Sequence, residues 1–154
     1  MHPTPHSYFS YGSNMDAASM RRRCPESRCL GVGCLTDYQL VFTDFLAERH
    51  RGGADILPQN GAQVWGLLYE LSEVDLNRLD ANKVYPAVYE RFPVHIQQPG
   101  GTVLENVWTY ALRDKPSANY PPTQAYRDLL IQAATDHQFP ESYLAYLRAF
   151  ATRN

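Results

Sequence analysis

A short segment near the start of the chain, residues 8–15 with the sequence YFSYGSNM, constrains the fold most. Its alternating aromatic and small residues predict a strand over Tyr8–Tyr11, which a glycine then interrupts. A helix is predicted directly afterwards, over Met15–Arg23. Such a strand–glycine–helix junction exposes unpaired backbone N–H groups, which can hold a carboxylate or another oxyanion. The same pattern also suits a plain turn in which Asn14 or Asp16 caps the helix.

The rest of the chain shows patterns of several strands and three further helices. The triplet Gln59-Asn60-Gly61 is typical of a tight turn, so the apolar runs on either side of it are predicted as two separate strands. Gln98–Gly101 predicts a hairpin turn between two later strands. Because strands and helices are partly segregated, the predicted fold class is α+β, a small mixed β-barrel with helices packed outside. The predicted strands are Cys29–Phe42 with internal turns, Ala54–Leu57, Val64–Leu71, Tyr89–Gln97 and Thr102–Leu112; the predicted helices run from Ser72 to about Lys83, over Thr123–His137 and from Pro140; Glu48–Gly53 is a predicted loop.

Length and charge limit the classes of function. The chain has 154 residues, which suits one domain over residues 1–154, and 44% of them are apolar, which is enough for a core. The 14 basic and 16 acidic residues give a net charge of −2, which argues against nucleic acid as a partner. The basic cluster Arg21–Arg23 falls at a predicted helix end, where cations complement the helix dipole, so we interpret it as a solvated end.

The sequence carries no signal for a membrane, a metal or a nucleotide cofactor. No apolar run reaches transmembrane length and no signal peptide is recognised, so a cytoplasmic location is expected. The three cysteines lack paired spacing and the five histidines are scattered, which argues against a metal site. No Walker-type or GxGxxG loop occurs, so no cofactor is expected.

An ordered set of motifs resembles the γ-glutamylcyclotransferase family, which includes AIG2-like relatives from plants and bacteria. The resemblance covers nearly the whole chain. Its first part is YGSN at residues 11–14, which resembles the opening loop of the family. The other matching stretches are Gly53–Ile56, Val64–Tyr69, Leu79-Asp80, Tyr85-Pro86, Tyr89, Arg91, Trp108–Tyr110, Tyr126 and Pro140–Tyr143.

The resemblance implies a γ-glutamylcyclotransferase-like barrel and a reaction that needs no cofactor. In that reaction the α-amino group of the substrate attacks its own γ-amide carbonyl, so that 5-oxoproline forms and an amine or amino acid leaves. The expected partner is a small molecule bearing a carboxylate and an amine, with no nucleic acid and no membrane. Backbone N–H groups of the junction would hold substrate oxygens, and tyrosines would wall the pocket. The substrate-binding residues predicted in this way are Tyr11, Gly12, Ser13, Asn14, Met15, Tyr89, Tyr110 and Tyr126.

Lys83 is the predicted catalytic residue, and it departs from the family pattern. Aligned without a gap, the resemblance puts Lys83 where the family has a proton-transferring glutamate, and Val84 where a glycine usually follows. Leu76, Leu79 and Lys83 are spaced three and four residues apart, so they share one helix face, and the lysine is predicted to point inward or into a cleft. A lysine near a helix C-terminus also suits a simpler role, in which it complements the dipole and reaches water.

The chemistry of Lys83 has several alternatives. Burial lowers the pKa of a lysine, and a neutral amine takes up a proton, whereas a charged one binds a carboxylate or stabilises an oxyanion. Lys83 could instead pair with Asp55 or Glu70. These two carboxylates, ranked ahead of Glu90, are also the candidates to replace the family's glutamate, and Asp80 is expected to flank the cleft.

Three functions remain open from the sequence. The first is a γ-glutamylcyclotransferase-like enzyme that acts on a γ-glutamyl amide or related small acyl-amine with an altered proton-transfer group. The second is a non-catalytic protein on the same scaffold that binds a carboxylate-bearing metabolite. The third is an amide hydrolase, which differs from the first by admitting water to the reaction.

Overall fold

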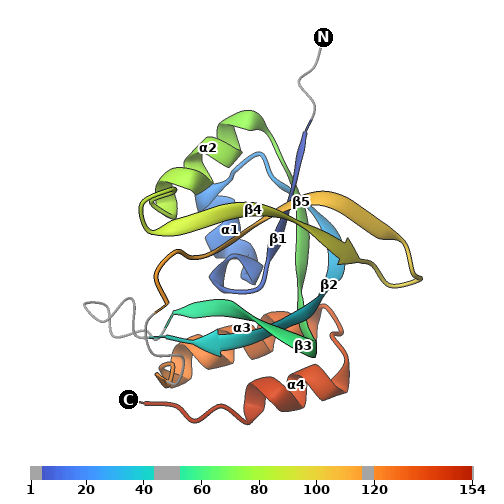
Figure 1. Cartoon of the computed structure of the whole chain (residues 1–154), viewed down its shortest axis with the longest axis vertical. Coiled ribbons are helices and arrows are strands. Elements are labelled where there is room, and N and C mark those ends of the chain that lie inside the picture. The colour runs from blue at the N-terminus through green and yellow to red at the C-terminus, as the bar shows by residue number, and fades with distance from the viewer. Residues whose placement is uncertain (1–4, 44–52, 116–119, 154) are drawn as a thin grey trace.

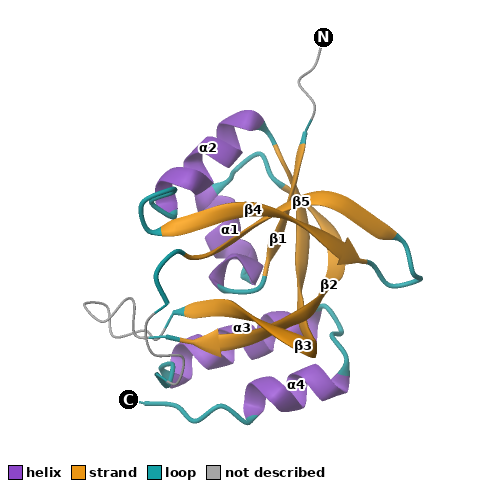
Figure 2. Ribbon diagram, viewed as in Figure 1, coloured by secondary structure: helices purple, strands orange, loops and turns teal. Residues whose placement is uncertain are grey.

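The computed structural model describes residues 5–43, 53–115 and 120–153, so most of the predicted loop Glu48–Gly53 lies outside the described residues. Within this part of the chain, five strands close into a barrel and helices pack around it (Figures 1 and 2). The predicted α+β class, a mixed barrel with flanking helices, is confirmed. The strands are β1 (His6–Ser10), β2 (Arg28–Phe42), β3 (Ala54–Leu71), β4 (Tyr89–Gln97) and β5 (Val103–Leu112); the helices are the 3₁₀ turn η1 (Ser13–Met15), α1 (Ala17–Arg23), α2 (Glu73–Asn82), α3 (Gln124–Asp136) and α4 (Glu141–Arg148).

The barrel has the strand order β1-β3-β2-β4-β5. Neighbouring strands are antiparallel except at the closure, where β1 and β5 run parallel and Tyr8 lies opposite Trp108. This closure brings the start of the chain beside its fifth strand. The junction that follows β1 is therefore held against the barrel rather than at a free edge.

The two longest strands correct one prediction. The Asn60-Gly61 signal predicts a tight turn that would split residues 54–71 into two strands, but β3 runs through it without reversing. Both halves of β3 pair with β2, and the register shifts between Thr36 and Tyr38, where residues 59–62 bulge out of the ladder. Gly61 has φ +81° and its N–H donates to Asp37 Oδ1, 2.9 Å away. The turn-forming residues therefore make a wide bulge, because a common partner strand holds both flanks.

The helices are positioned by caps and by apolar faces. Ser72, where the predicted helix begins, caps α2, with its Oγ accepting from the N–H of Asp75 at 3.1 Å, and Thr123 caps α3. The α3–α4 pair lies against the lower half of the β2–β3 ribbon, whereas α2 and α1 lie toward the other end of the barrel (Figure 1). No helix in the described ranges is both long and apolar enough to cross a bilayer.

The segment after β1 differs in detail from the single predicted helix Met15–Arg23. The 3₁₀ turn η1 comes first, the chain extends at Asp16, and only then does α1 begin. Asp16 caps α1, because its Oδ2 accepts from the N–H of Ser19 at 3.0 Å. The break at Asp16 therefore separates the 3₁₀ turn after β1 from the capped helix α1.

Candidate active site

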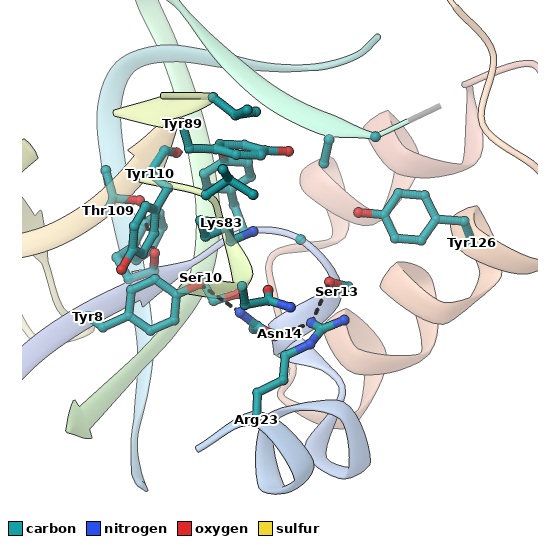
Figure 3. Close-up of a pocket in the computed structure, with 18 residues that line it drawn as sticks. Tyr8, Ser10, Ser13, Asn14, Arg23, Lys83, Tyr89, Thr109, Tyr110 and Tyr126 are labelled. Atoms are coloured by element: carbon teal, nitrogen blue, oxygen red, sulfur yellow. Dashed lines mark hydrogen bonds between the residues drawn. The ribbon is translucent and has the colours of Figure 1, made fainter. Parts of the chain in front are cut away.

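A cavity of about 270 Å³ opens at the junction between β1 and η1 (Figure 3). Its walls come from the loop after β1, the C-terminal end of α2, the strands β4 and β5, and α3. One predicted residue, Met15, does not line it, and Arg23, which was not predicted, does. The predicted residues that do line the cavity are Tyr11, Gly12, Ser13, Asn14, Lys83, Tyr89, Tyr110 and Tyr126.

Lys83, the C-cap residue directly after α2, projects into this cavity, as the leucine spacing predicts. Its backbone N–H still donates to Leu79 O at 2.9 Å, so the helix geometry fixes where the side chain starts. The ammonium nitrogen lies 4.9 Å from the ring centroid of Tyr89 and 5.9 Å from that of Tyr110. No hydrogen bond or ion pair joins Lys83 Nζ to any residue that the structure describes. The Lys83 ammonium is therefore covered by the faces of two tyrosine rings, and no carboxylate is bonded to it among the described residues.

The electrostatic setting of Lys83 weakens its hold on a proton. Burial, helped by the positive charge of Arg23 and opposed by Asp55, lowers the pKa of Lys83 from 10.5 to about 8. At pH 7 roughly one molecule in ten then carries a neutral amine at this position. Lys83 can therefore act both as a cation and, in its neutral form, as a base.

Arg23 is a charged cavity residue that the sequence interpretation missed. Its Nη1 donates to Ser13 Oγ at 3.0 Å and also to Asn14 Oδ1, so the guanidinium is tied to the loop after β1. Arg21 and Arg22 are exposed, as expected for a solvated helix end, but Arg23 is not. The signal lay in the helical spacing, because Arg23 falls four residues after the buried Ser19 and three after the buried Met20.

Asn14 fastens the loop that forms one wall of the cavity. Its Nδ2 donates to Tyr8 Oη at 3.1 Å, and its backbone carbonyl accepts from Tyr69 Oη at 2.8 Å. Its Oδ1 accepts from Arg23, so the side chain of Asn14 joins β1 to α1, and its backbone carbonyl adds the link to β3. An amide suits this position because it supplies donors and an acceptor together.

The amides of the loop do not all serve the predicted cradle. The N–H of Met15 donates to Gly12 O at 2.9 Å, which closes the 3₁₀ turn, and the Met15 side chain is buried in the core. Met15 is therefore not part of the cavity wall, contrary to the prediction. The N–H groups of Gly12 and Asn14 donate to no other residue in the described ranges. These two amides are the ones left for an anion.

Tyr126 reaches the same place from α3. A Cβ added to Gly12 would lie 3.3 Å from Tyr126 Oη, so a larger residue here would require the tyrosine to move by a few tenths of an ångström. Burial raises the pKa of Tyr126 to about 12, although hydrogen bonding with backbone groups of Ala54 and Ser13 opposes the shift. The phenol therefore stays protonated near neutral pH and can donate a hydrogen bond.

The other tyrosines divide between lining and support. Tyr110 presents its ring to the cavity, but its hydroxyl donates to Asp80 Oδ1 at 2.5 Å. Tyr11 Oη donates to the backbone carbonyl of Tyr110 at 2.6 Å and so braces the wall. Figure 3 shows the hydroxyls of Tyr89 and Tyr126 pointing into the space between them. Burial raises the pKa of the Tyr89 phenol, which keeps it protonated.

The carboxylates considered as replacements for the family's glutamate lie outside this cavity wall. Asp55 is fully buried, and its Oδ1 accepts from the N–H of Leu112 while its Oδ2 lies 3.0 Å from Lys115 Nζ. Glu70 pairs with an arginine of β2, and Glu90 pairs with an arginine just after β5. Asp80 binds Arg91 and Tyr110, so it flanks the cavity as predicted. No group of histidine, cysteine and acidic side chains suited to a metal occurs among the described residues.

Comparison with known proteins fits this geometry. A model of the AIG2-like family matches residues 63–147, more than half of the chain. The chain belongs to the AIG2-like family. The matched region begins within β3 and includes Lys83, Tyr89, Tyr110 and Tyr126. The cavity walls formed by the end of α2, by β4 and β5 and by α3 therefore lie inside it.

The curated relatives of this AIG2-like chain extend the likeness to the remaining part. The γ-glutamylcyclotransferase of Mus musculus is 28% identical over 147 residues, which cover 92% of this chain and 77% of that protein. The γ-glutamylcyclotransferase of Homo sapiens is 27% identical with the same coverage. A solved structure of a γ-glutamyl cyclotransferase superposes with a TM-score of 0.89 at 24% identity, covering 98% of this chain and 90% of that one, which shows a shared fold. The predicted resemblance to γ-glutamylcyclotransferases is confirmed.

Proposed function

We propose that this chain is a γ-glutamylcyclotransferase-like enzyme that releases 5-oxoproline from a γ-glutamyl amide or amine, with the Lys83 amine as its proton-transfer group. The observation that carries the proposal is a lysine in the cavity whose pKa of about 8 leaves part of it neutral at physiological pH. The names of the mouse and human relatives supply the reaction class. The resemblance supplies the position, because it aligns Lys83 with the family's glutamate.

The proton transfers balance within one catalytic cycle. Neutral Lys83 takes a proton from the α-ammonium of the substrate, and the freed amine attacks the γ-carbonyl carbon. The carbonyl oxygen becomes an oxyanion as the five-membered ring closes. The bond to the leaving nitrogen then breaks, the Lys83 ammonium gives its proton to that nitrogen, and the departing amine takes the second proton that the attacking nitrogen must lose to become the neutral lactam N–H. The enzyme ends in its starting protonation state, and no water or cofactor is consumed.

The rest of the cavity suits the charges that this reaction brings together. Arg23 and the free amides of Gly12 and Asn14 offer positive charge and donors to the α-carboxylate or the oxyanion. Tyr126 adds a protonated hydroxyl opposite them. Holding the substrate folded back on itself supplies several kcal/mol, because attack within one molecule avoids the entropy of bringing two together.

A second function is favoured by one observation. Most Lys83 side chains are charged at pH 7, and together with Arg23 they make the cavity a double cationic site. Such a site binds an acidic metabolite well even when no reaction follows. The alternative is therefore a binding protein for a carboxylate-bearing small molecule on the same scaffold.

A panel of γ-glutamyl amines and amides separates these functions. Release of 5-oxoproline supports the cyclotransferase, saturable binding without turnover supports the binding protein, and free glutamate points to a hydrolase. The variant Lys83→Gln is expected to lose activity by roughly 10²–10⁴-fold, because a general acid–base group contributes about that much.

A matched variant tests the assigned position. Lys83→Glu places a carboxylate where the resemblance expects one, and it is expected to install or raise cyclotransfer. No gain in a folded Lys83→Glu protein that still binds the substrate would contradict the alignment at this residue. Thermal unfolding of both variants controls for damage to the barrel.

A further inference from the structure

The cavity joins two cations of different chemistry. Arg23 always carries its charge, and it stays fixed because Ser13 and Asn14 hold its Nη1. Lys83 enters from the end of α2, and it lines the same cavity as Arg23, beside the Ser13–Asn14 segment (Figure 3). An arginine binds carboxylates in a defined orientation, whereas an amine free of a counter-ion can also react with carbon.

We propose that the cavity also binds small 2-oxo acids covalently, with Lys83 Nζ condensing with the carbonyl carbon while Arg23 holds the adjoining carboxylate. The inference needs only the cavity and its two cations, and it does not depend on the cyclotransfer reaction. The expected ligands are ketones and aldehydes with a carboxylate beside the carbonyl, such as pyruvate.

The bond changes in this step balance without a further reactant. The lone pair of neutral Lys83 adds to the carbonyl carbon, and proton transfer from nitrogen to oxygen gives a carbinolamine. Water then leaves with the former carbonyl oxygen, and a C=N bond joins the lysine to the ligand. The imine nitrogen takes up the proton that Lys83 released when it became neutral, so the protonated imine carries the same single positive charge as the resting ammonium, and addition of water reverses the process.

The surroundings of Lys83 favour the nucleophilic form of its amine. The rings of Tyr89 and Tyr110 cover Nζ at 4.9 and 5.9 Å without neutralising it, and Arg23 adds like charge nearby. Desolvation beside a second cation is the setting that prepares a lysine for imine formation. Lys115, by contrast, lies 3.0 Å from the Asp55 carboxylate, and an ion-paired ammonium offers no lone pair.

The volume of the cavity and its hydrogen-bond donors favour a small carbonyl compound that carries a carboxylate. A volume of about 270 Å³ admits a small metabolite but not a large cofactor. The Gly12 and Asn14 amides and the remaining N–H groups of Arg23 favour a carboxylate over a neutral substituent. Tyr126, held protonated, can donate to the carbonyl oxygen or to the hydroxyl that replaces it.

Reductive trapping tests the proposal directly. The full chain is incubated with pyruvate and sodium borohydride, and intact mass and peptide mapping locate the reduced adduct. The chain contains two lysines, Lys83 and Lys115, so the second is an internal control in the same sample. We expect a single adduct at Lys83. No adduct at Lys83, or equal labelling of Lys83, Lys115 and the terminal amine, would overturn the proposal.

Pyruvamide tests the part assigned to Arg23, because it keeps the ketone and lacks the charge. We expect roughly tenfold less adduct than with pyruvate, the loss that follows when a hydrogen bond to a charged group is removed. Equal trapping of the two compounds would overturn that assignment without any mutation.

Two conservative variants complete the test. Lys83→Arg is expected to lose the adduct, and Lys115→Arg, which keeps the charge beside Asp55, is expected to retain it. Retention of the full adduct in Lys83→Arg would contradict the proposal. The trapping experiment does not measure 5-oxoproline. An adduct can therefore form in a protein that has no cyclotransferase activity, and activity can occur without an adduct. The two proposals can thus fail separately.

Discussion

The two lysines of this chain lie in opposite electrostatic surroundings. Lys115 follows β5 and pairs with Asp55, a carboxylate that is fully buried at the start of β3. Lys83 directly follows α2 and faces aromatic rings, with a second cation nearby and no carboxylate bonded to it among the described residues. Lys115 neutralises a buried carboxylate, whereas the charge of Lys83 has no bonded counter-ion among the described residues.

The contrast separates a lysine that stabilises the fold, Lys115, from one that is placed for reactivity, Lys83. The buried Asp55 needs Lys115, because an uncompensated buried charge costs several kcal/mol. The charge on Lys83 instead opposes folding, because burial disfavours it, as its lowered pKa records. Unfavourable charge in a cavity is characteristic of functional sites.

Replacing each lysine by methionine gives the largest expected contrast. Lys115→Met leaves Asp55 buried without its cation, and the free energy of unfolding should fall by about 2–3 kcal/mol, since Lys115 itself is partly exposed. Lys83→Met removes a charge that burial disfavours and should leave stability unchanged or slightly raised. Urea denaturation of both variants measures the contrast. Equal destabilisation would show that Lys83 has a counter-ion after all.

The pH dependence of activity sharpens the same contrast. With a pKa of about 8, the neutral fraction of Lys83 rises about fivefold between pH 7 and pH 8 and levels off above about pH 9. The ratio of wild-type to Lys83→Glu kcat/KM should rise by the same factor, because the substrate's own titration cancels and the glutamate stays ionised. A ratio that is flat over this range would remove Lys83 from the role of base.

The smallest expected effect concerns the residue after Lys83. Val84 has φ +50°, a left-handed conformation that a β-branched residue adopts only under strain, and its side chain is 53% exposed. Val84→Gly should therefore raise the free energy of unfolding by about 1 kcal/mol, the strain relieved less the entropy of glycine.

Asn106 provides the control for that variant. It has φ +59° and is exposed, but asparagine tolerates this conformation, so Asn106→Gly should change stability by less than about 0.5 kcal/mol. Equal gains at both positions would mean that the segment after Lys83 carries no special strain.

Local patterns were sufficient to predict most of the fold. The capped start of α2, the hairpin between β4 and β5, and the last two helices follow from periodicity and turn residues, and they agree with the structure. The continuity of β3 could not be predicted, because Asn60-Gly61 is a strong local turn signal. The long-range pairing of both flanks with β2 decides the outcome, and no local window contains it.

Prediction of the cavity shows the same division. Lys83 could be placed because two leucines on its helix mark the buried face, and the structure puts its side chain in the cavity. Arg23 was missed because the run of three arginines was interpreted as one solvated end, although only Arg23 lies on the same helix face as the buried Ser19 and Met20. Met15 was wrongly included because the 3₁₀ turn, which consumes its N–H, is not visible in the sequence.

The way Asn14 is held has a consequence for how ligands arrive. Its side-chain amide and its carbonyl are already bonded to Tyr8, Arg23 and Tyr69, so the backbone beside the cavity is set during folding. An incoming anion therefore need not order this segment, and the entropic penalty of association is correspondingly small. The segment around Asn14 is therefore expected to have the same backbone conformation in the free protein and in its complex with a ligand.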